Sequence, residues 1–430
     1  MRKRLWLLGF GLALLLAACG GQGPGGENAQ VRVTLLDPQN AFQGAYYRVG
    51  ASSWQSLTFV DGQATFQASG EYQVVARCQD EVEGRVYHVK ATPSQMRQVA
   101  IRCSSPTSAP SAGASLTVRV PPNIGGIPIA DGSAIVSSGL SADILIDGGF
   151  IIVMAPDVTV QSGQATLRTG FPPGVQDIVL AVKRNDDAPC QQPIGWKRVR
   201  LDVQNNGDYT IDENDWQPFA ATRSINVVRG GSPALAPAYV AYFKDGMKNL
   251  AYLGHASGTT GCYGALPSGE GGVHLGFAVS SFDVSESSSQ RFIVLKDTGG
   301  DDWTVDVPAP WPDGALTVSG TTVSLSYPNA LSYVLQASGF LKDAQTQQPL
   351  LLYATFFPGS GTTHYTPPDA GSVLGYTLTA ADAYIVTAAA VVRGNAPSSE
   401  VLLDTGRMPS ESALRGIDIA VAVADVGQRD

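Results

Sequence analysis

The chain is poor in charged residues, and this scarcity restricts what it can bind. Asp, Glu, Lys and Arg make up 15% of its 430 residues, and the acidic excess gives a formal net charge of −9. Soluble domains usually carry about a quarter of charged residues. An acidic balance excludes the electrostatic footprint that binding to nucleic acid or to anionic headgroups needs. We therefore expect no nucleic-acid partner.

Residues that bind metals or attack substrates are also rare. The chain has four histidines and five cysteines, and no Cys-x-x-Cys pair. His255 and His274 flank Cys262 without the ligand spacing of a zinc site. The run Gly254–Gly258 has alanine at the centre, where a hydrolase nucleophile elbow needs serine. We predict no catalytic residue, no cofactor and no enzymatic activity, and an envelope hydrolase is the least favoured alternative.

Long apolar runs are absent except at the amino terminus. Basic residues in Met1–Arg4 precede an apolar run of 14 residues, Leu5–Ala18, which is long enough for a signal peptide and short for a membrane span. The run ends in Leu-Ala-Ala followed by Cys19, which resembles the lipobox of bacterial lipoproteins. The resemblance implies cleavage before Cys19, a diacylglycerol thioether on its sulfur, and palmitate or another acyl chain on its new amine.

A lipid anchor sets the expected location of the protein. Several acyl chains on one cysteine hold a protein on a membrane far more firmly than one chain does. The Gly-rich segment 20–30 has no apolar periodicity and is typical of a flexible tether. We expect a body outside the cytoplasm, in the cell envelope, whose partner at the anchor is the lipid bilayer.

Lipidation of Cys19 leaves an even number of cysteines, which suggests two disulfides in an oxidising compartment. Cys78 and Cys103 each end a strand of alternating apolar residues, so both point to the apolar face of one small module. This predicts the disulfide Cys78–Cys103. Cys190 and Cys262 then pair by elimination.

Helical periodicity is nearly absent, and short alternating runs bounded by Gly, Asp, Asn and Pro recur instead. These runs predict an all-β protein of tandem β-sandwich-like modules on a flexible N-terminal tether. Asp61-Gly62, between two such runs, is a strong hairpin signal. The predicted units are a signal peptide (1–18), the lipidated cysteine and tether (19–30), a small β-sandwich (31–103), a Ser/Pro linker (104–114), a second β module (115–228) and a C-terminal β-rich region (229–430).

The first module contains about seven short strands, and in strand count and spacing it resembles immunoglobulin-like or transthyretin-like modules. The Cys, Trp, Cys order of true immunoglobulin domains is missing, because Trp54 precedes both cysteines. The resemblance therefore implies a shared architecture and no particular activity.

One acidic run has two interpretations. Asp202, Asn206, Asp208 and Glu213 fall near the oxygen-ligand positions of a calcium-binding loop, with glycine at the sixth position. The same run fits an ordinary hairpin of strands 198–203 and 208–211 around an Asn-Asn-Gly turn. The hairpin is favoured, because the flanking segments predict strands and not helices.

Tryptophans supply the alternative functional hypothesis. Trp303 and Trp311 are candidates for stacking on sugar rings, and Trp311 stands in a Pro-rich, loop-like segment. The leading hypothesis is a non-enzymatic, membrane-anchored lipoprotein that binds or spaces other envelope components, either protein or glycan. The alternative is a glycan-binding surface module that uses these two rings.

Overall fold

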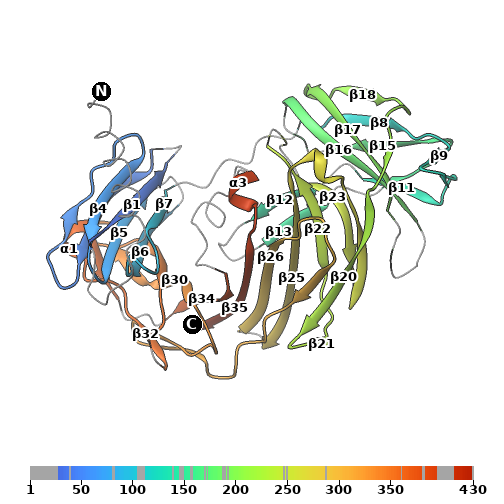
Figure 1. Ribbon diagram of the computed structural model, residues 1–430. Helices are drawn as coiled ribbons and strands as arrows, with labels where there is room; N and C mark the ends of the chain where they lie inside the picture. Colours follow the sequence, from blue (N-terminus) through green and yellow to red (C-terminus); the bar gives the residue numbers. More distant parts are fainter. Residues whose placement is uncertain are drawn as a thin grey trace, which may run out of the picture.

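The computed structural model (Figure 1) describes residues 28–37, 40–79, 83–103, 112–137, 140–144, 150–154, 158–168, 171, 173–185, 190, 193–245, 247, 250–285, 288–359, 361–379, 383–394 and 411–428. Almost every element within them is a strand, so the predicted all-β class is confirmed. The four largest hydrophobic cores of the described residues divide the strands into four sandwich-like units, which we call modules 1 to 4 in chain order.

Module 1 (29–103) shows why alternation produces a sandwich. In its first strand Val31 and Val33 are fully buried while Arg32 is exposed, because successive side chains point to opposite faces. One sheet has the order β4-β1-β7, and the strands β3-β2-β5-β6 lie against it. The strands are β1 (Ala29–Leu36), β2 (Phe42–Val49), β3 (Gln55–Ser56), β4 (Gln63–Ala68), β5 (Tyr72–Gln79), β6 (Gly84–Ala91) and β7 (Gln98–Arg102).

Module 2 (112–218) packs a three-stranded sheet, β15-β8-β18, against a five-stranded sheet, β14-β11-β16-β17-β19. The same part of the chain forms two short hairpins, β9–β10 and β12–β13, and Figure 1 shows the second of them beside β23 (Ala251–Ala256) and β26 (Ser288–Asp297) of module 3. The strands are β8 (Ser115–Arg119), β9 (Asn123–Ile124), β10 (Ile127–Pro128), β11 (Ala134–Ser137), β12 (Leu140–Ile144), β13 (Phe150–Met154), β14 (Val158–Thr159), β15 (Gln164–Arg168), β16 (Gly174–Arg184), β17 (Pro193–Val203), β18 (Asp208–Ile211) and β19 (Gln217–Pro218).

Module 3 (221–307) encloses a core that contains Trp303 and Phe277. Its first strand, β20, pairs with β24 and β27, so this unit includes residues 221–228 that the sequence assigned to the second module. The elements are β20 (Ala221–Arg229), β21 (Ser232–Pro233), β22 (Ala238–Phe243), β23 (Ala251–Ala256), β24 (Thr260–Ala265), the 3-10 helix η1 (Ser268–Glu270), β25 (Val273–Ser285), β26 (Ser288–Asp297) and β27 (Trp303–Asp306).

Module 4 (315–393) follows, and a last strand, β35, lies between it and module 3. The core of module 4 is covered on one side by the small sheet β28-β29-β32. The elements are β28 (Leu316–Ser319), β29 (Thr322–Leu325), β30 (Ser332–Asp343), β31 (Pro349–Phe356), β32 (Thr363–Tyr365), α1 (Gly371–Leu374), β33 (Tyr376–Leu378), β34 (Tyr384–Arg393), α3 (Glu411–Leu414) and β35 (Asp418–Gln428).

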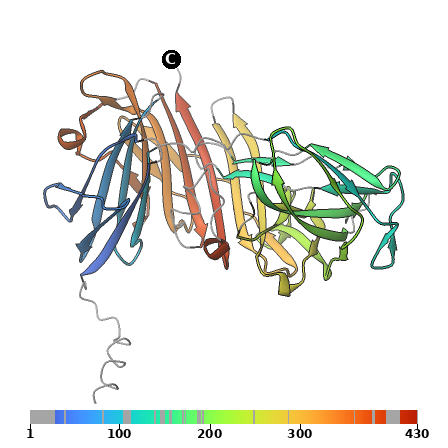
Figure 2. The ribbon, with the colours of Figure 1, turned by 90° about the horizontal axis from the view of Figure 1, so that it is seen from above.

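One hydrogen-bonded sheet of 17 strands passes through modules 1, 4 and 3. Strand β6 of module 1 pairs in parallel with β31 of module 4, from Gly84 opposite Leu350 to Lys90 opposite Phe356. Strand β35 pairs with β34 of module 4 on one edge and with β26 of module 3 on the other. The modules therefore lie in the spatial order 1-4-3-2, which Figures 1 and 2 show as a row from blue through orange and yellow to green.

The predicted hairpin of strands 198–203 and 208–211 is wrong, because its two strands lie in opposite sheets of module 2. Strand β17 pairs with β16 and β19, whereas β18 pairs in parallel with β8 in the opposite sheet of module 2. In the same way β26 pairs with β25 and β35, and β27 pairs with β20. The short segments between these strands therefore connect strands that do not pair with each other.

Candidate functional site

The four histidines lie in separate surroundings. His88 contacts Tyr365, His255 contacts Tyr252, His274 accepts a hydrogen bond from the backbone N–H of Leu266, and His364 contacts Ser324. Among the residues that the structure describes, no three His, Cys, Asp or Glu side chains are grouped so that they could hold a metal ion.

The segment around Cys262 does not build a catalytic or metal site. Cys262 forms a disulfide and is not free to act as a ligand. Gly254, at the start of the Gly-His-Ala-Ser-Gly run, lies in strand β23, which pairs with β22 and β24 on its two edges. A nucleophile elbow needs a strand-to-helix turn, which this geometry does not provide.

The candidate calcium ligands Asp202, Asn206, Asp208 and Glu213 do not form a metal site within the described chain. The Tyr209 hydroxyl occupies the bend instead, since it donates to the Asp202 carbonyl (2.9 Å) and accepts from the Gln204 N–H (2.7 Å). The carboxylate of Asp212 lies 2.6 Å from the Lys197 ammonium, which also donates to the carbonyls of Asp212 and Asn214. The oxygen atoms at 212–214 therefore already bind the ammonium group of Lys197.

The expected exposure of Trp303 and Trp311 is wrong. Trp303 is 1% exposed and Trp311 is 4% exposed. The Trp303 ring packs over Gly276, where an added Cβ would lie 2.8 Å from the ring, and Trp311 packs against Tyr327 and Tyr333. Neither face is available to a sugar, because rings of this size gain most by filling a core. The burial of both rings therefore gives no support to the glycan-binding alternative.

Cys19 and residues 20–27 of the expected tether lie outside the described residues, whereas Ala29 and Gln30, the last residues assigned to the tether, belong to strand β1. Within the described part of the chain, none of the helices has the length and apolar character needed to cross a membrane.

The feature that distinguishes this chain is how its modules join. At two of the three junctions, between modules 1 and 4 and between modules 4 and 3, strands are buried on both faces, so that one sheet covers two cores. Alternate residues of β34 and β35 point to the core of module 3 or to that of module 4. Toward module 3 point Ala389, Val391, Ile419, Val421 and Val423, and toward module 4 point Val386, Ala388, Ala390, Ala422 and Ala424.

The junction of modules 1 and 4 follows the same rule. In β5, Val74 and Ala76 face the core of module 1, while Val75 faces the core of module 4. On the module 4 face Arg77 forms an ion pair with Asp343 and donates to the carbonyls of Leu374 (2.9 Å) and Gly375 (2.8 Å). Because Arg77 bonds to three acceptors of module 4, it fixes the position of the two units as well as their contact.

His88 lies in the same junction and is 3% exposed. Its Nε2 lies 3.1 Å from the Gln73 side-chain oxygen, and its Nδ1 lies 2.9 Å from the Tyr365 hydroxyl of module 4. Arg48, which can only donate, also bonds to that Gln73 oxygen, so Nε2 carries the proton and Tyr365 donates to Nδ1. Burial, followed by the charges of Lys90 and Arg48, lowers the pKa of His88 to about 3. The imidazole is therefore neutral at physiological pH.

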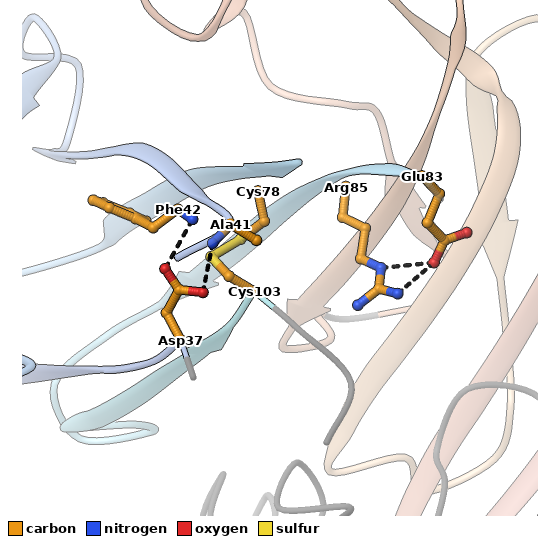
Figure 3. The surroundings of a disulfide bond; sticks show 7 residues. All are labelled: Asp37, Ala41, Phe42, Cys78, Glu83, Arg85 and Cys103. Carbon is orange, nitrogen blue, oxygen red and sulfur yellow. Dashed lines mark hydrogen bonds and ion pairs between the residues drawn. A yellow bond between two sulfur atoms is a disulfide. The ribbon is translucent and has the colours of Figure 1, made fainter. Parts of the chain in front are cut away.

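The two disulfides have different positions. Cys78–Cys103 joins β5 to the residue after β7 and so links the two sheets of module 1. Figure 3 shows this disulfide beside the Asp37 carboxylate, which accepts the backbone N–H groups of Ala41 (2.8 Å) and Phe42 (2.9 Å). Cys190–Cys262 joins the β16–β17 connection of module 2 to β24 of module 3. This pairing is the one that strand alternation and elimination predict.

No protein-family model matches the chain, and no curated protein matches it. Among solved structures it is similar to the Bacillus anthracis TIE protein, at 9% identity over 58% of this chain and 45% of that one, with a TM-score of 0.14. A streptococcal ancillary pilin matches at 10% identity over 59% of this chain and 89% of its own, with a TM-score of 0.13. The major pilin subunit of Bacillus cereus matches at 10% identity over 65% and 99%, also with a TM-score of 0.13. The chain spans less than half the length of the TIE protein. Identities this low concern the fold alone, and similarity at these TM-scores carries no argument about activity.

Proposed function

We propose that this chain is a membrane-anchored, non-enzymatic envelope protein whose stiff body holds or spaces other envelope components. The observation that carries the proposal is the sheet that passes through three modules, with strands at its junctions buried on both faces. An enzyme needs a pocket in which reactive groups converge. A spacer protein instead needs junctions between its modules that do not bend.

The junctions resist bending because bending breaks backbone hydrogen bonds and exposes apolar surface at the same time. Seven residue pairs join β6 to β31, and seven join β26 to β35. Removing apolar surface from water contributes about 25 cal/mol per Å², and the junction strands β5, β34 and β35 provide this contribution on two faces. A hinge at either junction would therefore unfold part of two modules.

Cys19 supplies the proposed anchor. The lipobox resemblance and the Gly-rich segment 20–30 support attachment by one end, with the body beginning at β1. Metabolic labelling with palmitate tests this part. We expect the wild-type chain to take up the label and Cys19→Ser to lose both the label and membrane retention. Labelling of the variant would contradict the anchor while leaving the spacer proposal untouched.

The spacer proposal has its own test. The full lipidated chain is placed in vesicles that contain a lipid dye, and energy transfer to a fluorophore attached enzymatically at the carboxyl end reports the distance between that end and the membrane. We expect the detergent-solubilised chain, labelled near both ends, to give one narrow distance distribution, and its small-angle scattering to fit a single rigid shape. A broad distribution in the oxidised wild-type protein would contradict a stiff body.

A further inference from the structure

The junction between modules 2 and 3 is built differently from the other two. Among the described residues, no strand of module 2 pairs with the sheet that unites modules 1, 4 and 3. The backbone link is short, since Pro218 ends β19 and Ala221 begins β20. Between these strands, Phe219 packs over Gly264, where an added Cβ would lie 2.5 Å from the ring.

Side chains and one covalent bond hold this junction. Val179 and Trp196, from the outer face of β16 and β17, belong to the core of module 3. The Lys183 ammonium lies 4.4 Å from the centroid of the Tyr252 ring and 3.4 Å from its hydroxyl. Cys190–Cys262 adds the cross-link, and its Cα atoms are 5.1 Å apart. In the described part of the chain no ladder of backbone hydrogen bonds joins modules 2 and 3, so without this bond only side-chain contacts hold them together.

The two disulfides also differ in their access to solvent. Cys78 and Cys103 are both 0% exposed, and they lie inside the core of module 1. Cys190 and Cys262 are both partly exposed. Thiol–disulfide exchange requires a thiolate to reach a sulfur atom in line with the bond, so access decides which disulfide reacts in the folded protein.

We propose that Cys190–Cys262 is a redox latch that sets the position of module 2 on module 3. A dithiol reductant opens it: one thiolate attacks one sulfur and forms a mixed disulfide, and the second thiol of the reductant displaces the cysteine. Two cysteine thiols form, and the reductant becomes a disulfide, so two electrons and two protons reach the protein. Module 2 then moves about residues 219–220, while modules 1, 4 and 3 stay together as one sheet.

The first experiment measures which disulfide opens. The folded full chain is treated with dithiothreitol under native conditions, quenched at intervals with an alkylating agent, and mapped by mass spectrometry. We expect Cys190 and Cys262 to be alkylated at least about tenfold faster than Cys78 and Cys103, because only the first pair is accessible. Equal rates for the two pairs, or earlier opening of Cys78–Cys103, would overturn the latch.

The second experiment measures what opening does, using a matched pair of buried lysines. Lys183 is 5% exposed at the junction, and Lys197 is 6% exposed within module 2, where Asp212 and Asn214 hold its ammonium. After selective reduction we expect acetylation of Lys183 to rise several-fold while Lys197 stays protected, and the scattering profile to broaden. Reoxidation should reverse both changes.

A double variant separates the latch from other effects of reductant. Cys190→Ser with Cys262→Ser should resemble the reduced wild-type chain from the start and should not change when dithiothreitol is added. If Lys183 remains protected in the fully reduced wild-type chain and in this variant, the side-chain contacts alone hold module 2 and the proposal is wrong. The outcome does not depend on Cys19, so failure here leaves the anchor and spacer proposals standing.

Discussion

Replacing His88 by glutamine tests the description of the junction between modules 1 and 4. The side chain is buried as a neutral imidazole between Gln73 and Tyr365, and its pKa is lowered to about 3. In the unfolded chain a histidine has a pKa of about 6.5. Between these two pKa values the unfolded chain binds a proton at His88 and the folded chain does not. The free energy of unfolding therefore increases as the pH rises through this range and decreases as the pH falls.

The magnitude follows from the two pKa values. Lowering the pH from 7.5 to 5 should cost about 2 kcal/mol through His88 alone, because the unfolded side chain becomes protonated and the folded one does not. His274, whose pKa burial lowers to about 4, should add a loss of similar size from module 3. This range lies above the pH at which most carboxylates titrate, so the two histidines dominate it.

The assay is urea unfolding of the oxidised chain at several pH values, followed by signals from separate modules because a protein of this size need not unfold in one step. His88→Gln should remove about 2 kcal/mol of the pH dependence from the transition of modules 1 and 4. His364→Gln, in an exposed position, serves as the matched control and should leave that dependence unchanged. An unchanged slope in His88→Gln would refute a buried neutral imidazole at this junction.

Three other changes have defined outcomes. Arg77→Ala removes the ion pair to Asp343 and two bonds to backbone carbonyls, and should destabilise the junction of modules 1 and 4 by about 2–4 kcal/mol in urea unfolding, with Arg77→Lys recovering only part. Ala422→Leu forces a larger side chain between two cores and should cost about 1–3 kcal/mol, whereas the same change at an exposed strand position should cost little. Calcium or a chelator should leave the melting temperature unchanged, and a rise of several degrees with calcium would contradict the contacts found around Asp202 and Asp212.

Strand positions could be predicted from the sequence because each follows from a local rule. Alternation of apolar residues locates β1 and β4, and Asp61-Gly62 forms a tight turn in which both residues have positive φ angles, 50° and 71°. What the turn does not reveal is the partner of the next strand. β4 pairs with β1 rather than with the segment just before the turn, where one isolated bridge joins Val60 and Gln63.

The junctions could not be predicted, because their partners are distant in sequence. Nothing near Arg77 indicates that its carboxylate partner is Asp343, 266 positions later. The Ala-rich runs of β34 and β35 did carry a signal: continuous small apolar residues are typical of strands buried on both faces. These runs therefore indicate a sheet that is shared by two cores, but they do not indicate which two cores share it.

For the tryptophans, a local sequence pattern suggested the wrong location. A Pro-rich setting suggested that Trp311 lies at the surface. Gln290 of β26 instead bonds to its backbone N–H and its carbonyl and ties the segment to module 3, while the ring packs into the core of module 4. The composition of a loop does not determine whether a tryptophan in it is buried or exposed. The area gained by burying an indole ring does.

The shared sheet has a consequence for how the polypeptide matures. The outer edge of β6 stays open until β31 has been synthesised, and two hydrophobic interiors remain incomplete until β35, the final strand, arrives. Contacts between residues so far apart in the sequence make folding slow, and until they form, unpaired strand edges are exposed and can aggregate. The cores of modules 3 and 4 are therefore completed only after β35 has been synthesised, although β26 and β34 precede it in the sequence.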